Sequence, residues 1–183
     1  MLEVRPLGLD GVFEIRPRKF GDERGFFSET WNGNAMAEAG FDLAFVQDNH
    51  SYSAEKGVLR GLHFQLPPFA QDKLVRVSRG AIFDVVVDIR RGSPSFGKWV
   101  GSLVSAALWN QVLVPKGFAH GFVTVEDHTE VQYKVTAPYR PDQERSIRFD
   151  DPAIGIDWPI AAADVQLSAK DREAPLLAAV ETQ

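Results

Sequence analysis

Short runs of alternating apolar and polar residues, separated by glycine- and proline-containing turns, cover most of the chain. Side chains alternate between two faces along a β-strand, so such runs predict strands. The clearest run, Gly80–Arg90, would place Phe83, Val85, Val87 and Ile89 on one face and Asp84, Val86 and Asp88 on the other. Further strands are expected at Gly11–Pro17, Phe26–Trp31, Ala44–Ser53, Leu59–Gln65, Lys73–Val77, Trp99–Ala106, Asn110–Val114, Gly121–Val125, Glu130–Thr136 and Ser146–Phe149. Many short strands with regularly spaced turns predict an all-β sandwich or barrel.

Helices are expected only as short flanking pieces. Asn32–Ala39 is followed by Gly40, a typical residue after a helix C-terminus. An Ala/Leu-rich segment, Pro175–Val180, is a second helix candidate, and residues 19–25 have the composition of a turn-rich loop. The length favours a single domain over residues 1–183, with a core at about 12–159 and a helical tail at 160–183.

Composition narrows the possible functions. A hydrophobic share of 44% suits a globular protein with a buried core. A net charge of −5 argues against nucleic-acid or membrane-surface binding, which needs broad basic patches. The chain has no cysteine, which excludes disulfides, cysteine nucleophiles and thiolate metal sites, and fits a reducing compartment. Charges near the N-terminus and the lack of a bilayer-length apolar run favour a cytoplasmic location.

The stretch from Gly57 to Val77 carries polar side chains on faces that should point inward. On the expected strands, His63 shares a face with Leu59, Gly61 and Gln65, and Lys73 shares a face with Val75 and Val77. Burying such groups without partners is costly, so they either pair with carboxylates or line a pocket. An ordinary surface lysine is the alternative for Lys73, although its apolar register makes this alternative weaker.

A second histidine follows a turn, in the pattern P-x-G-x-x-H that ends at His120. This pattern alone fits a core histidine equally well. Together with the His63 stretch it resembles the two motifs of the cupin superfamily, whose fold is a double-stranded β-helix of the jelly-roll kind. Metal-binding cupins usually supply several histidines and a glutamate, whereas this chain offers two histidines and no nearby carboxylate in the motifs. No metal is therefore expected.

Seven motifs, in the same order, resemble the dTDP-4-dehydrorhamnose 3,5-epimerase family. The similarity extends from Val12 to Asp171, nearly the whole chain, and the set is more specific than any single motif. The motifs are Arg24–Glu29, Gln47–Ser51, Gly57–Gln65, Gly117–Phe122, Tyr133–Lys134, Asp150–Pro152 and Leu167–Asp171.

This resemblance implies an isomerase that inverts C3 and C5 of dTDP-4-dehydro-6-deoxy-D-glucose, giving dTDP-4-dehydro-L-rhamnose. Both carbons flank the C4 ketone, so their protons can be removed if the enolate is stabilised. A base and an acid on opposite faces are then sufficient, and neither a cofactor nor a metal is expected. The family also implies a homodimer built by strand exchange, with the dTDP-linked 4-keto-6-deoxy sugar as the ligand.

The resemblance assigns four catalytic roles. His63 matches the base, and Asp171 matches the carboxylate that orients it, although Asp171 also fits a helix N-cap. Lys73 would stabilise negative charge on O4 of the sugar. Tyr133 matches the acid, although its place between Val131 and Val135 fits a core tyrosine equally well.

Further positions match residues that hold the substrate. Arginine suits the two phosphates because its charge is permanent and its donors form a fork. Tyr139 matches an aromatic side chain that stacks on thymine, with a solvated loop tyrosine as the alternative. The remaining positions are Arg24, Glu29, Gln47, Asp48, Asn49, Arg60, His120, Glu144 and Lys170.

Two positions leave structural alternatives open. Strict alternation puts Arg60 on the face opposite His63, unless a bulge at Gly61 turns both inward or Arg60 acts at a subunit boundary. Asp72 stands where the family usually has glycine, and it could pair with Lys73 or, as we expect, point to solvent on a loop.

Two other functions remain possible on the sequence. One is a mono-epimerase that acts at C3 or C5 alone on a related nucleotide-linked 4-keto sugar. The other is a cupin that binds a ligand without catalysis, which the joint presence of His63, Lys73, Tyr133 and Asp171 disfavours.

Overall fold

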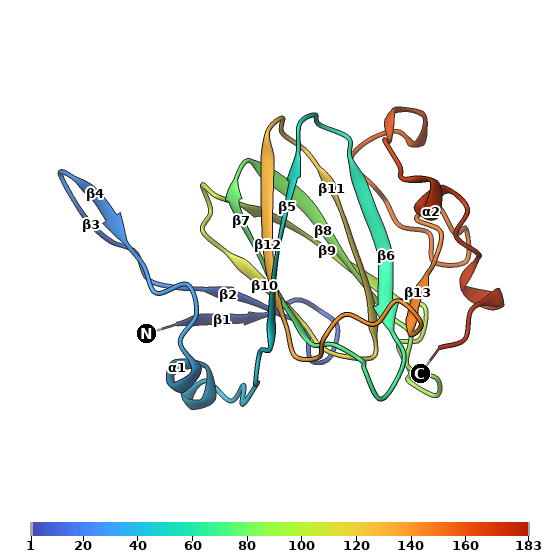
Figure 1. Cartoon of the computed structure of the whole chain (residues 1–183), viewed down its shortest axis with the longest axis horizontal. Coiled ribbons are helices and arrows are strands. Elements are labelled where there is room, and N and C mark those ends of the chain that lie inside the picture. Colours follow the sequence, from blue (N-terminus) through green and yellow to red (C-terminus); the bar gives the residue numbers. More distant parts are fainter. Residues whose placement is uncertain (1, 183) are drawn as a thin grey trace.

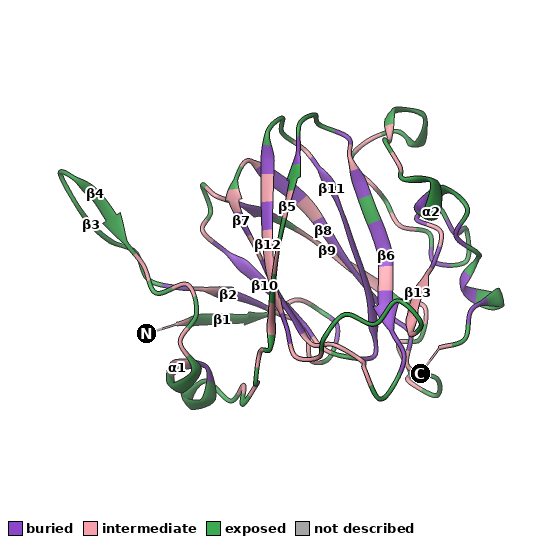
Figure 2. Ribbon diagram, in the orientation of Figure 1, coloured by how far each residue is buried: buried purple, intermediate pink, exposed green. Residues whose placement is uncertain are grey.

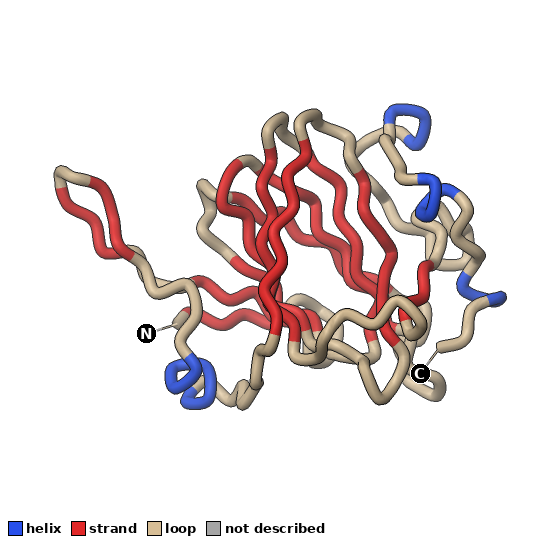
Figure 3. Tube along the Cα trace, in the orientation of Figure 1, coloured by secondary structure: helices blue, strands red, loops and turns tan. Residues whose placement is uncertain are grey.

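Two antiparallel β-sheets packed face to face form the body of the protein in the computed structural model, which describes residues 2–182 (Figure 1). Met1 and Gln183, the ends of the predicted domain, lie outside the described residues. One sheet has the order β1 (Glu3–Pro6), β2 (Phe13–Arg16), β10 (Gln111–Val114), β7 (Lys73–Arg79), β12 (Thr129–Val135) and β5 (Gln47–Ser53). The other has the order β13 (Glu144–Ser146), β6 (Leu59–Gln65), β11 (Phe118–Thr124), β8 (Ala81–Asp88) and β9 (Trp99–Ser105). The predicted all-β jelly roll is confirmed, and strands dominate the body in Figure 3.

The five-stranded sheet is buried on both faces. Alternate residues of β8 point to different apolar clusters: Val86 packs between the sheets with Val75 and Val131, whereas Val85 and Val87 pack on the outer side. The outer cluster is completed by residues from the C-terminal segment, namely Ile147, Ile154, Leu177 and Val180. The segment after β13 therefore covers this sheet, as Figure 1 shows beside β6.

A β-bulge interrupts the pairing of β6 with β11. His120 lies opposite His63 and Phe122 lies opposite Arg60, so β6 has one more residue than β11 in this interval. Gly61 has a φ of +128°, and a Cβ at this position would lie 2.5 Å from the Cα of Gly121. Only glycine allows this close approach, and the extra residue changes the alternation so that Arg60 and His63 line one cavity.

A two-stranded arm extends from the body (Figure 1). It consists of β3 (Phe20–Asp22) and β4 (Gly25–Phe27), and it is exposed along both strands (Figure 2). The predicted loop at 19–25 is right only for the turn at residues 23–24, and the predicted strand Phe26–Trp31 is right only for Phe26 and Phe27, because the two segments pair as a hairpin and the chain leaves the hairpin after Phe27. The strand β1 was not predicted, since its four residues are all exposed and show no apolar alternation.

The helices are short and lie at the edges of the body. Helix α1 (Gly33–Glu38) confirms the first predicted helix, and the side chain of Asn32 caps its N-terminus by accepting a hydrogen bond from the backbone N–H of Ala35. The tail contains η1 (Ala162–Asp164), α2 (Ala169–Arg172) and η2 (Leu177–Ala179). None of the helices within residues 2–182 is both long and apolar enough to cross a bilayer.

Two predictions for the C-terminal part were wrong. The segment Pro175–Val180 forms only the single turn η2, because Leu177 and Val180 are used to dock against the sheet. The last strand is Glu144–Ser146 instead of Ser146–Phe149, since Ile147 and Phe149 enter apolar clusters after the strand has ended.

The bulge predicts that Gly61→Ala is more destabilising than an ordinary glycine replacement. The new methyl group would overlap the backbone of Gly121, so we expect a loss of about 3 kcal/mol and a Tm lower by about 10 °C. The control is Gly92→Ala, where φ is +85° but no atom lies within 4 Å of the added Cβ. It should cost only about 1 kcal/mol. Equal Tm values for the two variants, measured by calorimetry, would show that the close approach is unimportant.

Candidate active site

Two adjoining cavities between the sheets share His63, Lys73 and Tyr133. Their volumes are about 260 and 320 Å³. The first is also lined by Ser51, Arg60, His120, Phe122, Ser168, Lys170 and Asp171. The second is also lined by Gln47, Asn49, Phe64, Gln65, Gln71, Tyr139 and Glu144. Together they form one cleft, which we call the central cleft, and it collects most of the predicted site residues.

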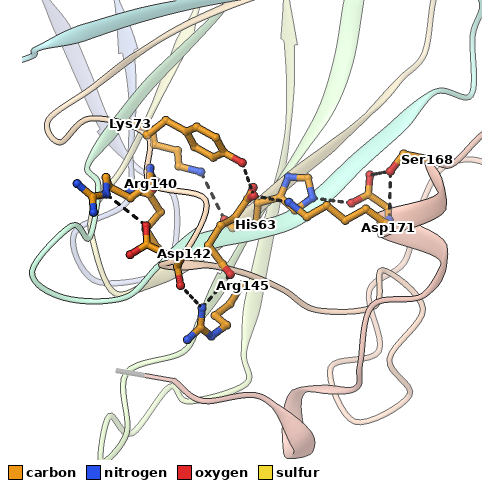
Figure 4. A network of polar contacts seen from close by, with 11 residues as sticks. His63, Lys73, Arg140, Asp142, Arg145, Ser168 and Asp171 are labelled. Carbon is orange, nitrogen blue, oxygen red and sulfur yellow. Dashed lines mark hydrogen bonds and ion pairs between the residues drawn. The ribbon is translucent and has the colours of Figure 1, made fainter.

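His63 and Asp171 form a close pair at one end of the central cleft. The Nε2 of His63 lies 2.5 Å from Oδ1 of Asp171 (Figure 4). Ser168 caps helix α2 by accepting the Asp171 N–H, and its hydroxyl donates to Oδ2 of the same carboxylate at 2.9 Å. Asp171 is therefore the third residue of the helix, and the alternative that it is the N-cap was wrong.

Asp171 is almost fully buried yet remains ionised. Burial acts to raise its pKa, but hydrogen bonds from His63 and Ser168 and the charge of Lys170 outweigh this effect, so the pKa is lowered. A carboxylate at this position fixes the ring orientation of His63 and stabilises its protonated form. Because Nε2 faces Asp171, Nδ1 is the ring nitrogen left to accept a proton.

Lys73 lies on the side of His63 opposite Asp171 (Figure 4). The residue is only 8% exposed, and its ammonium group donates to the backbone oxygen of His63 at 3.4 Å. Burial lowers its pKa from 10.5 to about 8, although Glu144 and Asp84 act in the opposite direction. The predicted inward register with Val75 and Val77 is confirmed, and Lys73 supplies a weakly solvated positive charge to the cleft.

Tyr133 enters the cleft from the six-stranded sheet, opposite the sheet that carries His63. It lies on β12, packs against the apolar cluster between the sheets, and still lines both cavities. Burial raises the pKa of its phenol, and the nearby charge of Arg60 only partly opposes this. The hydroxyl is therefore protonated at neutral pH and can act as a proton donor.

His120 has a partner, Asp84, that was not predicted from the sequence. The Nε2 of His120 lies 2.7 Å from Oδ2 of Asp84, and both side chains are buried. The signal was present, since Asp84 shares an inward face with Val86 on a strand whose alternation is clear. This second histidine–carboxylate pair lies beside the first cavity and places the His120 ring at its wall.

Hydrogen bonds and an ion pair link five predicted residues at the second cavity. Glu144 accepts the hydroxyl of Tyr139 at 2.8 Å and forms an ion pair with Lys170. Burial acts to raise the pKa of Glu144, but Lys170 and Tyr139 lower it overall. On the other side, Gln47 accepts the backbone N–H of Tyr139 and donates to Asn49.

Three predicted substrate-binding residues lie away from the central cleft of their own chain. Arg24 and Glu29 belong to the arm and the segment after it, and Arg24 pairs with Asp22 at 2.6 Å. Asp48 points to the outer face of the six-stranded sheet, where Lys134 donates to it at 2.7 Å. Strand alternation explains this, because Gln47 and Asn49 on either side face the cleft.

Asp72 does not pair with Lys73 among the contacts of the described residues. Its carboxylate instead accepts hydrogen bonds from the backbone N–H of Lys116 and the hydroxyl of Thr136, each at 3.0 Å. The expectation that it points to solvent was therefore only partly right, because Asp72 joins two turns at the cleft rim. Over residues 2–182, no three or more His, Cys, Asp or Glu side chains come together as a possible metal site.

Comparison with known proteins gives a consistent result. Residues 6–179 match the family model described as dTDP-4-dehydrorhamnose 3,5-epimerase. The chain is 55% identical to the Sinorhizobium fredii protein of that name, over 93% of this chain and 87% of the relative. It also resembles the crystal structure of a dTDP-6-deoxy-D-glucose-3,5-epimerase from Legionella pneumophila in complex with dTDP-4-keto-L-rhamnose, with a TM-score of 0.94, 46% identity, and coverage of 99% and 95% of the two chains.

A relative with a narrower name is also similar. The dTDP-4-dehydrorhamnose 3-epimerase of Streptomyces niveus is 40% identical over 97% of this chain and 84% of the relative. Overall similarity therefore extends to a protein named for inversion at one carbon.

The environment of Lys73 predicts a titration near pH 8. In protein labelled with ¹³C-lysine, the Lys73 side-chain signal should shift with a midpoint of about 8, because burial disfavours the charged amine. Glu144→Gln should move the midpoint to lower pH, since that carboxylate raises the pKa. Lys73→Arg identifies the signal by removing it. A midpoint near 10.5, or an upward shift in Glu144→Gln, would contradict this electrostatic description.

Proposed function

The chain belongs to the dTDP-4-dehydrorhamnose 3,5-epimerase family, and we propose that the central cleft carries out both proton exchanges of that reaction. The enzyme is an isomerase, and its ligand is a dTDP-linked sugar. It inverts C3 and C5 of dTDP-4-dehydro-6-deoxy-D-glucose to give dTDP-4-dehydro-L-rhamnose. The observation that carries the residue assignment is the origin of His63 and Tyr133 from opposite sheets, with one cleft between them. Inversion requires a base on one face of the sugar and an acid on the other.

In this proposal His63 removes the proton from the carbon next to the C4 ketone. Nδ1 accepts the proton, and Asp171 stabilises the imidazolium through the 2.5 Å contact at Nε2. The electrons of the broken C–H bond move toward O4, giving an enolate. The buried charge of Lys73 stabilises the developing negative charge on this oxygen.

Tyr133 then returns a proton to the opposite face of the same carbon. Its raised pKa keeps the hydroxyl protonated until the enolate collapses, and Arg60 stabilises the phenolate that remains. His63 then releases its proton to solvent and Tyr133 takes one up from solvent, which restores both groups. Two such exchanges, one at C3 and one at C5, complete the conversion. No redox step is involved, because each carbon loses and regains one proton.

The nucleotide occupies the second cavity in this proposal. The ring of Tyr139 stacks on thymine, while Gln47 and Asn49 provide polar contacts from the lining of the same cavity. Lys170 contributes its charge from the lining of the first cavity. Arg60 and His120 hold the sugar end of the ligand. These assignments are supported by the lining of the two cavities and by the motifs shared with the family.

Incubation of the substrate with the enzyme in deuterated water should label both C3 and C5, as detected by proton NMR. His63→Ala should lower the rate of labelling about 10³-fold, and Tyr133→Phe should lower it about 10²-fold or more, because each removes a proton-transfer group. His63→Ala should retain dTDP binding within about twofold, since the imidazole acts on the sugar. The control is His128→Asn, an exposed histidine outside both cavities, which should retain full activity.

The labelling pattern separates the alternative functions. Deuterium at only one carbon would identify a mono-epimerase, as in the relative named for 3-epimerisation. No deuterium in a folded protein that binds dTDP would leave a binding protein and refute the proposed chemistry.

We further propose that the protein is a homodimer in which the arm of one subunit reaches the central cleft of the other. Phe20, Phe26 and Phe27 are 52%, 54% and 67% exposed on the arm, and exposed aromatic side chains grouped in this way favour an interface. Arg24 lies at the arm tip, between β3 and β4. If the arm of one subunit lies at the central cleft of its partner, Arg24 and Glu29 can bind substrate there although they lie away from the cleft of their own chain.

Light scattering after size-exclusion chromatography should give twice the 20.3 kDa chain mass. Phe27→Asp should shift the protein toward the monomer mass and reduce activity, because a buried unpaired carboxylate opposes association. Phe96→Asp is the matched control, since Phe96 is an exposed phenylalanine outside the arm. A wild-type mass of one chain would overturn the dimer proposal.

A cytoplasmic location is part of the same proposal. The absence of cysteine in the sequence fits a reducing compartment. Cell fractionation with an antibody against the native protein would test this location.

A further inference from the structure

Tyr139 stands at the edge of the central cleft with little side-chain packing to hold it. The residue is 50% exposed, and its hydroxyl donates to Glu144 at 2.8 Å. This hydrogen bond holds only the tip of the Tyr139 ring, so the orientation of the ring plane depends on the backbone of residues 137–140. This loop follows β12 and has no regular secondary structure around Tyr139.

Glutamine side chains hold the backbone on both sides of Tyr139. Oε1 of Gln65 accepts the backbone N–H of Arg140 at 2.7 Å, and Nε2 of Gln65 donates to the backbone oxygen of Pro138 at 3.2 Å. Gln47 accepts the N–H of Tyr139 itself at 3.0 Å. The loop is thus fixed at three consecutive residues by side chains that come from β5 and β6.

Gln65 also joins this loop to a second one. Its Nε2 donates to the backbone oxygen of Phe69 at 2.7 Å. The guanidinium of Arg140 lies over the ring of Phe69, with 4.7 Å between Cζ and the ring centroid. One amide therefore connects the loop after β6 with the loop that carries Tyr139.

Gln65 is buried in the five-stranded sheet, so its own backbone is held in place. It is 3% exposed and lies at the end of β6, a strand paired on both sides with β13 and β11. It follows His63 by two residues, so both side chains lie on the same face of the strand and line the second cavity. Buried amides with several hydrogen bonds are costly to disrupt, and this favours one loop conformation.

We propose that Gln65 is a positioning residue for nucleotide binding, acting through Tyr139. It holds the 137–140 backbone so that the aromatic ring is oriented for a nucleobase before the ligand arrives. A preformed aromatic surface avoids the entropy cost of ordering the loop on binding. This inference rests on the proposed stacking of Tyr139 on thymine. Gln65 lines the second cavity, which is assigned to the nucleotide, and not the first, which is assigned to the sugar, so its effect falls on nucleotide affinity.

The test compares dTDP binding in Gln65→Leu, Tyr139→Ala and the double variant by isothermal titration calorimetry. Leucine has nearly the volume of glutamine but makes none of the hydrogen bonds. Gln65→Leu should weaken dTDP binding about tenfold and raise KM by a similar factor, while kcat at saturating substrate changes by less than about twofold. In the Tyr139→Ala background the same substitution should have almost no further effect on affinity, because the residue through which it acts is absent.

A matched control removes a buried amide elsewhere. Asn110 is 2% exposed, accepts the N–H of Ser105, and donates to Glu14 and to the backbone oxygen of Leu103, but it lines neither cavity of the central cleft. Asn110→Leu should lower Tm and leave dTDP affinity unchanged. If Gln65→Leu fails to fold, Gln65→Glu retains the length and the acceptor for Arg140 while losing the donor to Pro138 and Phe69, and it is tested in the same way.

Each result decides the question. The inference is supported if Gln65→Leu weakens dTDP binding in the wild-type background but has no further effect on binding in the Tyr139→Ala background. Unchanged affinity in Gln65→Leu, or an equal tenfold loss in both backgrounds, overturns it while leaving the stacking role of Tyr139 intact. Unchanged affinity in Tyr139→Ala overturns the stacking role and this inference with it, while the deuterium test of catalysis stands independently.

Discussion

The close approach of β6 and β11 at Gly61 is the constraint on which the active site depends. A side chain at position 61 would overlap the backbone of Gly121. The strands β6 and β11 can therefore approach this closely only because residue 61 is glycine. The resulting bulge places Arg60 and His63 in one cavity, although simple alternation would separate them. One residue without a side chain therefore allows a permanent positive charge and an imidazole to line the same cavity.

The interior of the jelly roll tolerates ionisable groups because each has a partner. His63 pairs with Asp171, His120 pairs with Asp84, and Glu144 pairs with Lys170. Burial of charge is costly without such pairing, and it is the pairing that lets the cleft hold both acids and bases in fixed positions. Lys73 is less well compensated: within residues 2–182 its ammonium group makes only a long contact to a backbone oxygen, and burial lowers its pKa to about 8. Such a weakly solvated charge would act strongly on the oxyanion that develops in the proposed reaction.

The segments outside the two sheets complete the site from different directions. The C-terminal segment covers the outer face of the five-stranded sheet with Leu177 and Val180. The same segment places Asp171, with its partner Ser168, beside His63. The loop after β12 brings Tyr139 to the cleft, held by glutamines from neighbouring strands. The arm contacts its own body through Phe26, whose ring packs edge-on against Trp109 with 4.8 Å between the ring centroids. Its Arg24 nevertheless lines neither cavity of the central cleft, which is why we assign its residues to a partner subunit.

The sequence by itself determined the features that depend on local pattern. Alternation identified β8 and the inward direction of Lys73, because successive side chains of a strand point to opposite faces. The regularly spaced turn residues between such runs indicated an all-β fold. Shared motifs identified the family and selected His63, Tyr133 and Asp171 as candidate catalytic residues. Local pattern failed where a segment's structure is set by distant contacts, as in the arm hairpin and in Pro175–Val180, whose apolar residues dock on a sheet instead of forming a helix.

The tertiary structure alone decided which side chains meet. Whether Arg60 faces His63 depends on the packing of Gly61 against a residue 60 positions later in the chain. The pairing of His120 with Asp84 likewise joins residues that are 36 positions apart, and the turn contacts of Asp72 span 44 and 64 positions. Such contacts are fixed when strands that are distant in sequence pair with each other. Periodicity along one strand indicates which of its side chains face inward, but it does not identify the residues that will lie opposite them on the partner strand.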